Sequence, residues 1–325
     1  MTLSTPRPEA ATLLAMLRYR RPASTKTERY FIERFIEPLG VERDAYGNLT
    51  KRIGDAPVLW SCHTDTVHSQ GGKQKLAIEG NIVKADGASN CLGADCTTGV
   101  WLMAEMIKAG KPGLYVFHRD EEIGGHGSNH IAHKTPELLD GIKMAIAFDR
   151  YGTKSIITHQ WGGRCCSDVF AKSLGAELGL GMEADDGGSF TDTANYTDLV
   201  GECTNVSVGY LHQHTKREQQ DVAFALRLLD ALLALDVWRI QVFRQPGDPD
   251  PDEVHRWKAK GGTRQPCYTD WMDDVWGQEE APPRRSHTIL SLVRDHPDEI
   301  ADWLEEHGIG TAELLEVVQS RGGPF

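Results

Sequence analysis

Long apolar segments are missing from this 325-residue sequence. No run approaches the roughly 18 consecutive apolar residues that a membrane-spanning helix needs. The first 21 residues also lack the apolar core and small-residue cleavage site of a secretory signal peptide. We therefore expect a cytoplasmic protein with no membrane partner.

A disulfide framework and a basic cluster are missing as well. The seven cysteines are odd in number and scattered, and Cys165 and Cys166 are direct neighbours, which is typical of reduced thiols in a cytosolic protein. The net charge is −12, and residues 245–325 alone contain 17 acidic against 8 basic side chains. Because nucleic-acid binding depends on neutralising phosphates, the sequence argues against a nucleic-acid partner.

What the sequence does contain is an alternation of short apolar runs and helix-like stretches. This alternation predicts an α/β fold with a doubly wound mixed sheet flanked by helices. The predicted strands are residues 58–62, 114–118, 144–148 and 204–208, and the predicted helices are residues 8–18, 24–38, 97–109 and 219–235. Ser24 is the expected cap of the second helix, with Glu28 nearby.

The composition changes after residue 244. Residues 245–251 read QPGDPDP, which is typical of a solvated linker. Residues 287–320 then have the pattern of short amphipathic helices. We therefore predict two parts, a main domain over residues 1–244 and an acidic linker with a small helical appendage over residues 245–325.

Five segments with chemically active side chains lie where a predicted strand ends or a helix begins. In open α/β sheets, loops at the carboxyl ends of the strands converge on one crevice, so these side chains are expected to meet. The segments are SCHTDTVH with His63 and Asp65, LGADCTTGV with Asp95, HRDEEIGGHGS with Glu121 and Glu122, AIAFDRYG with Asp149, and SVGYLHQHTKRE with His214 and Glu218.

Such a group of histidines and carboxylates points to bound cations. Crowded carboxylates repel one another unless cations neutralise them. Imidazole nitrogen together with carboxylate oxygen suits zinc, and also cobalt or manganese. Two cations need a bridging carboxylate, and one further carboxylate must remain free to take a proton from water. The neighbours Glu121 and Glu122 offer a ligand and a base from one loop.

The order of these motifs over residues 10–235 resembles that of the di-zinc exopeptidase clan, which includes aminopeptidases, carboxypeptidases, tripeptidases and acyl-amino-acid deacylases. The resemblance implies two divalent ions and a peptide or acyl-amino-acid substrate. It implies His63 and Asp149 on one ion, Glu122 and His214 on the other, and Asp95 bridging them. Asp65 would orient His63, and Glu121 would be the general base that activates a water between the ions. The peptide bond between Asp95 and Cys96 is expected to be cis.

Two departures from the clan bear on function. Relatives usually have an acidic residue where this chain has Cys96, so we expect a changed environment beside the metals without loss of metal. Only 64 residues separate Asp149 from His214, too few for an inserted lid or dimerisation domain. The resemblance is therefore to compact aminopeptidases, and the number of subunits stays open.

Several alternatives remain open at this point. An N-acyl-amino-acid amidohydrolase or carboxypeptidase and a non-catalytic binding protein are rival functions, and a thiol-dependent hydrolase is a weaker one. His212 could replace His214 as a ligand, although the spacing to Glu218 favours His214. Arg150 and Arg164 are candidates to bind an anionic substrate group, and Asp192 lies in a GGSFTD segment that resembles a specificity pocket of relatives.

Overall fold

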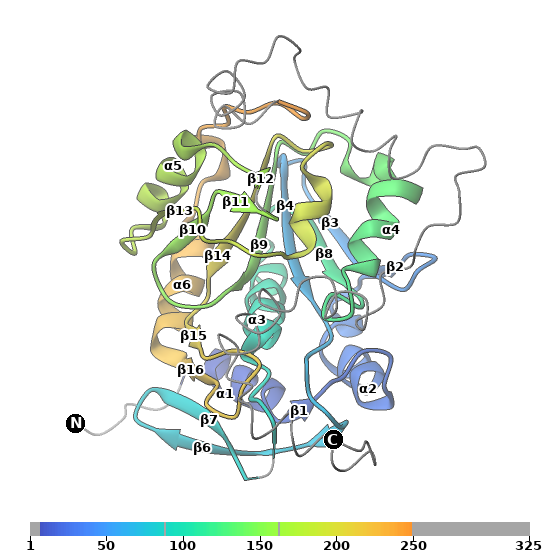
Figure 1. The fold of residues 1–325 in the computed structure, drawn as a ribbon, viewed down its shortest axis with the longest axis vertical. Helices are drawn as coiled ribbons and strands as arrows, with labels where there is room; N and C mark the ends of the chain where they lie inside the picture. Colours follow the sequence, from blue (N-terminus) through green and yellow to red (C-terminus); the bar gives the residue numbers. More distant parts are fainter. Residues whose placement is uncertain (1–6, 88, 162, 249–325) are drawn as a thin grey trace, which may run out of the picture. The chain divides into compact units, whose positions relative to one another are not determined.

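The computed structural model describes residues 7–87, 89–161 and 163–248, all within one compact unit. The described chain contains an eight-stranded mixed sheet in the order β13-β10-β14-β9-β4-β8-β3-β2 (Figure 1). The central strands β14 (Glu202–Ser207), β9 (Met144–Arg150), β4 (Val58–His63) and β8 (Gly113–His118) are mutually parallel. The predicted mixed α/β sheet flanked by helices is therefore confirmed.

The outer strands complete the large sheet. On one side β10 (Ser155–Ile157) pairs antiparallel with β14 and parallel with β13 (Glu183–Asp185). On the other side β3 (Leu49–Ile53) and β2 (Glu42–Arg43) continue antiparallel from β8. Among these outer strands, β2, β3 and β13 contain charged residues, whereas β10 reads SII.

The central strands are buried on both faces, which explains the largely apolar sequences of β4, β8 and β9. Alternate residues face opposite sides of a sheet. Val58, Trp60 and Cys62 of β4 belong to the larger apolar cluster, whereas Leu59 belongs to the second one. The larger cluster contains residues of α1 (Pro8–Met16), α2 (Lys26–Phe35), α3 (Ala94–Lys108), α5 (Asp168–Leu178) and α6 (Val222–Ala234). The second contains residues of α4 (His126–Lys134) and of η3 (Asp192–Tyr196).

A second, four-stranded sheet joins distant parts of the chain. Its order is β15 (Tyr210–Leu211), β16 (Gln219–Asp221), β7 (Ile82–Asp86) and β6 (Lys75–Glu79). The helix predicted over residues 219–235 is therefore wrong in its first three residues, which pair with β7. The helix begins at Val222 because the Asp221 side chain caps it by accepting a hydrogen bond from Phe224 N.

The start of α2 also differs from the prediction. Thr25, and not Ser24, is the capping residue, since its hydroxyl accepts from Glu28 N at 3.3 Å. Ser24 N instead donates to the Glu28 carboxylate at 2.7 Å. Within the described ranges no helix is long and apolar enough to cross a membrane. Residues 249–251 of the predicted linker and all of the predicted tail helices lie outside the described residues.

Candidate metal centre

Five neighbouring segments bring the predicted site residues together. His63 ends β4, Asp149 is the second-last residue of β9, and Glu121 and Glu122 follow β8. Asp95 lies at the start of α3, where Asp95 and Cys96 have non-helical backbone angles and are joined by a cis peptide bond, as expected. His214 lies between β15 and β16. The convergence follows from the parallel direction of β4, β8 and β9, which end at the same edge of the sheet.

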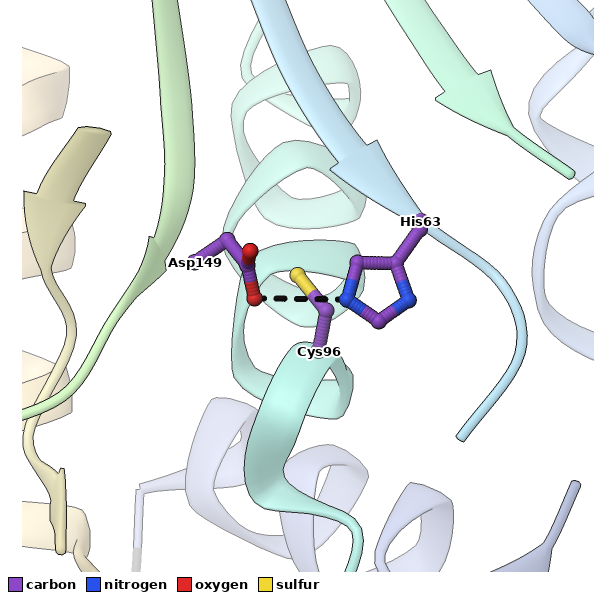
Figure 2. A group of neighbouring side chains, drawn as sticks. All are labelled: His63, Cys96 and Asp149. Carbon is purple, nitrogen blue, oxygen red and sulfur yellow. Dashed lines mark hydrogen bonds and ion pairs between the residues drawn. The ribbon is translucent and has the colours of Figure 1, made fainter. Parts of the chain in front are cut away.

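His63 is at the centre of one of two groups of potential metal ligands, which we call the first donor group. Its Nε2 atom lies 3.1 Å from Asp95 Oδ1 and 3.3 Å from Asp149 Oδ1 (Figure 2). Its other ring nitrogen lies 3.2 Å from the carbonyl oxygen of Asp65 and 3.5 Å from the Asp65 carboxylate. Asp65 therefore fixes the ring so that Nε2 faces the acidic groups.

His214 is the centre of the second donor group. Its Nε2 atom lies 3.1 Å from Asp95 Oδ2 and 3.3 Å from Glu122 Oε2. Although burial lowers the pKa of His214, its hydrogen bonds with Asp95 and Glu122 raise that pKa to about 11. In the metal-free protein this imidazolium thus supplies positive charge among the carboxylates.

Asp95 stands between the two groups, with one oxygen toward each histidine. Burial raises its pKa, but the hydrogen bonds with His214 and His63 outweigh burial and lower it. Glu122 Oε1 is buried and has no hydrogen-bond partner among the described residues. An unpaired buried carboxylate oxygen and a shared carboxylate between two imidazoles fit a pair of divalent cations.

Glu121 lies beside the first group and is not one of its closest donors. Its Oε2 atom is 3.9 Å from His63 Nε2, and its side chain is 10% exposed. Burial raises the pKa of Glu121 well above its ordinary value, and the charges of Asp149 and Asp192 raise it further. Asp65 holds the loop, because its carboxylate accepts hydrogen bonds from Glu121 N at 3.2 Å and Glu122 N at 3.1 Å.

Glu218 has a role that the sequence did not reveal. Its carboxylate accepts four backbone hydrogen bonds of 2.8–3.2 Å from the segment that leads into α3, donated by Leu92, Gly93, Ala94 and Asp95. The side chain is buried. Glu218 therefore connects the loop that contains His214 to the segment that ends at Asp95.

The donor groups line a cleft with an empty volume of about 510 Å³. Its walls also include Arg150, Tyr151, Gln160 and Phe190. The Arg150 guanidinium lies 4.1 Å from the centre of the Tyr151 ring and 3.3 Å from the Asp185 carboxylate. This volume includes space open to solvent, and the potential metal ligands are among the lining residues, so a small substrate can reach them.

The other two predicted substrate residues do not line this cleft. Arg164 pairs with Asp168 at 2.8 Å. Asp192 is 1% exposed and lies 3.3 Å from His118 Nδ1. Burial raises the pKa of Asp192 to about 8. His118 in turn lies 2.6 Å from the Tyr196 hydroxyl, in a buried network that sequence patterns did not indicate.

Comparison with known proteins identifies the same architecture elsewhere. No protein-family model and no curated protein matches the chain. Its structure is similar to aminopeptidase PepT from Bacillus cereus, with a TM-score of 0.57 and 16% identity, over 70% of this chain and 96% of that one. A tripeptidase from Staphylococcus aureus gives a TM-score of 0.58 and 14% identity, over 72% and 98%. Aminopeptidase APDkam598 from Desulfurococcus kamchatkensis gives 0.55 and 13%, over 69% and 94%. The chain shares the fold of these zinc-exopeptidase-like proteins.

Proposed function

We propose that this chain is a metal-dependent exopeptidase, and more specifically an aminopeptidase, that hydrolyses a peptide or amide bond. The observation that carries the proposal is the position of Asp95, whose two oxygens lie 3.1 Å from His63 Nε2 and 3.1 Å from His214 Nε2. A carboxylate in this position can serve two cations at once. The structural neighbours described as aminopeptidases and a tripeptidase support a peptidase.

The donor set fits two divalent ions, with zinc as the first choice and cobalt or manganese as alternatives. His63 and Asp149 would hold one ion, Glu122 and His214 the other, and Asp95 would bridge them. When bound, the ions would polarise the scissile carbonyl and make water a stronger acid.

Glu121 is proposed as the general base. It takes a proton from the attacking water and delivers that proton to the leaving amine. Its support is the placement of its carboxylate at the wall of the cleft and its pKa, which burial raises toward the range where a carboxyl group can both accept and return a proton. Asp65 orients His63 and holds the loop of Glu121 through two backbone hydrogen bonds.

The substrate class follows from the lining of the cleft. Arg150 is proposed to bind an anionic group of a peptide, because it is the arginine of the predicted pair that lines the cleft.

The chain between Asp149 and His214 forms short strands, α5 and η3 inside the same compact unit. This supports the compact, lid-free architecture and, with it, an aminopeptidase over an acyl-amino-acid amidohydrolase or carboxypeptidase.

The replacement Glu121→Gln tests the mechanism. The variant should keep its metal content and lose turnover of aminoacyl amides by about 10²–10⁴-fold, the usual contribution of a general base. The exposed Glu137 offers a matched control, and Glu137→Gln should retain full activity. Full activity of Glu121→Gln would contradict the assigned base.

A substrate comparison separates the remaining functions. Aminoacyl amides cleaved in preference to N-acyl amino acids would support the aminopeptidase, and the reverse order would support the amidohydrolase. Metal binding without turnover of either class would support a binding protein. Six free, buried cysteines among the described residues agree with the proposed cytoplasmic location, where thiols stay reduced.

A further inference from the structure

Cys96 lies in the first donor group, a position that the motif comparison did not assign to a ligand. Its sulfur, a ring nitrogen of His63 and a carboxylate oxygen of Asp149 all lie within 4.8 Å of one another. Figure 2 shows the thiol pointing between the imidazole and the carboxylate. Ligand atoms about 2.0–2.3 Å from one ion are at most about 4.6 Å apart, so three atoms gathered within 4.8 Å can share an ion after a small movement.

The local backbone directs the thiol to this place. Cys96 has non-helical backbone angles, so its side chain leaves the chain before the regular turns of α3 begin. Gly99, one turn later, provides the room: a Cβ atom there would lie 2.5 Å from Cys96 Sγ and 2.4 Å from the carbonyl oxygen of Phe148. The absence of a side chain at residue 99 therefore lets the sulfur reach the donor group.

We propose that Cys96 is a metal ligand that binds the same ion as His63 and Asp149, which gives that ion nitrogen, oxygen and sulfur donors. This inference rests on the proposed metal-dependent function. As the sulfur–metal bond forms, the thiol S–H bond breaks and its proton passes to water. No oxidation state changes: the metal ion stays +2, and the sulfur binds it as a thiolate.

A sulfur donor changes which metals the site prefers. Thiolate is a soft ligand that favours zinc or cobalt over manganese, whereas carboxylate and imidazole alone discriminate less. The chain therefore selects a narrower range of ions at this position than an all-carboxylate site would.

The competing interpretation gives Cys96 a purely structural role. Its thiol donates a hydrogen bond to the carbonyl oxygen of Phe148 at 3.1 Å, and a serine could replace that donor. A serine hydroxyl cannot replace a soft sulfur ligand. Cys96→Ser therefore separates the two roles. Cys203→Ser is the matched control, because the Cys203 thiol is also buried and donates to a carbonyl oxygen, that of Val200 at 3.4 Å, and Cys203 belongs to none of the potential ligand groups of the described chain.

The test is a titration of the metal-free protein with Co²⁺, followed by near-ultraviolet absorption and by analysis of bound cobalt. We expect a thiolate-to-cobalt charge-transfer band in the unmodified protein and in Cys203→Ser. Cys96→Ser should bind cobalt without this band, and its preference for zinc over manganese should fall by about tenfold.

The other outcomes overturn the inference in distinguishable ways. Bound cobalt without the band in the unmodified protein would exclude Cys96 as a ligand and leave the proposed function standing. No bound cobalt at all would contradict the proposed function and this inference together. If Cys96→Ser does not fold, the spectrum of the unmodified protein still decides, since a missing band there refutes the assignment.

Discussion

The buried ion pair between Glu28 and Arg119 should control how firmly the donor loops are held. Glu28 lies in α2 and is fully buried, and Arg119 reaches it with two hydrogen bonds of 2.7 and 2.9 Å. The same carboxylate accepts from the hydroxyl of Thr64, which follows His63, at 2.6 Å. The Glu28 side chain thus binds both the loop that follows β4 and the loop that follows β8.

The replacement Arg119→Met removes the charge and keeps much of the aliphatic bulk. It leaves a buried carboxylate with only neutral donors, from Ser24 N and the Thr64 hydroxyl. Breaking a buried pair in this way costs about 3–5 kcal/mol. For a domain of this size that corresponds to a fall of about 6–20 °C in Tm. Because the carboxyl can limit the cost by binding a proton, the loss of stability should be larger at alkaline than at acidic pH.

Chemical denaturation of Arg119→Met, Glu28→Gln and the double variant measures the coupling directly. We expect the double variant to be more stable than Arg119→Met, since it no longer buries an unpaired charge. The pair of Arg7 and Asp230 is the control, because it has bonds of 2.8 and 2.9 Å but side chains 40% and 57% exposed. Arg7→Met should cost less than about 1 kcal/mol. Equal losses for Arg119→Met and Arg7→Met would refute the argument from burial.

Three further predictions concern the metal centre. Because the pKa of His214 is about 11 in the metal-free protein, a bound metal must displace its proton. The apparent zinc affinity should therefore rise with pH, by about tenfold per pH unit for each proton released. A zinc affinity that calorimetry finds independent of pH would contradict this prediction. Glu218→Gln should lower the zinc affinity about 10–100-fold, because an amide cannot accept all four backbone hydrogen bonds from the segment that ends at Asp95. An unchanged zinc affinity would show that this segment keeps its conformation without Glu218. Arg150→Met should raise KM for acidic peptides several-fold while Arg164→Met, away from the cleft, should not, and the opposite pattern in steady-state kinetics would exchange their roles.

The parts of the fold that sequence predicts best are those buried on both faces. The runs in β4, β8 and β9 are largely apolar and buried at every or nearly every position, so their sequences alone locate them. β14 is equally buried but reads ECTNVS, so burial and not an apolar sequence marks it. Since parallel strands end at one edge, the convergence of the donor residues also follows from the sequence. The structure brings these side chains together, whereas their roles as ligands and base stay predictions.

Other features depend on contacts that no local pattern encodes. Gln219 and Gln220 have no strand-like sequence and become β16 because β7, more than 130 residues earlier, offers them a partner. The placement of Cys96 depends on the backbone angles at residues 95–96 and on the space above Gly99. The prediction for Asp192 depends on a motif and that for Arg164 on its place in the sequence, and the cleft wall is formed by other side chains.

The measurement that tests the bridged metal centre most directly is the metal content of the purified protein, before and after dialysis against a chelator. The arrangement of Asp95 between His63 and His214 predicts about two equivalents of zinc, cobalt or manganese per chain, lost with the chelator and restored on adding metal. A protein that binds no metal at neutral pH, even with zinc supplied, would contradict the metal-dependent function and make the binding-protein interpretation the better one.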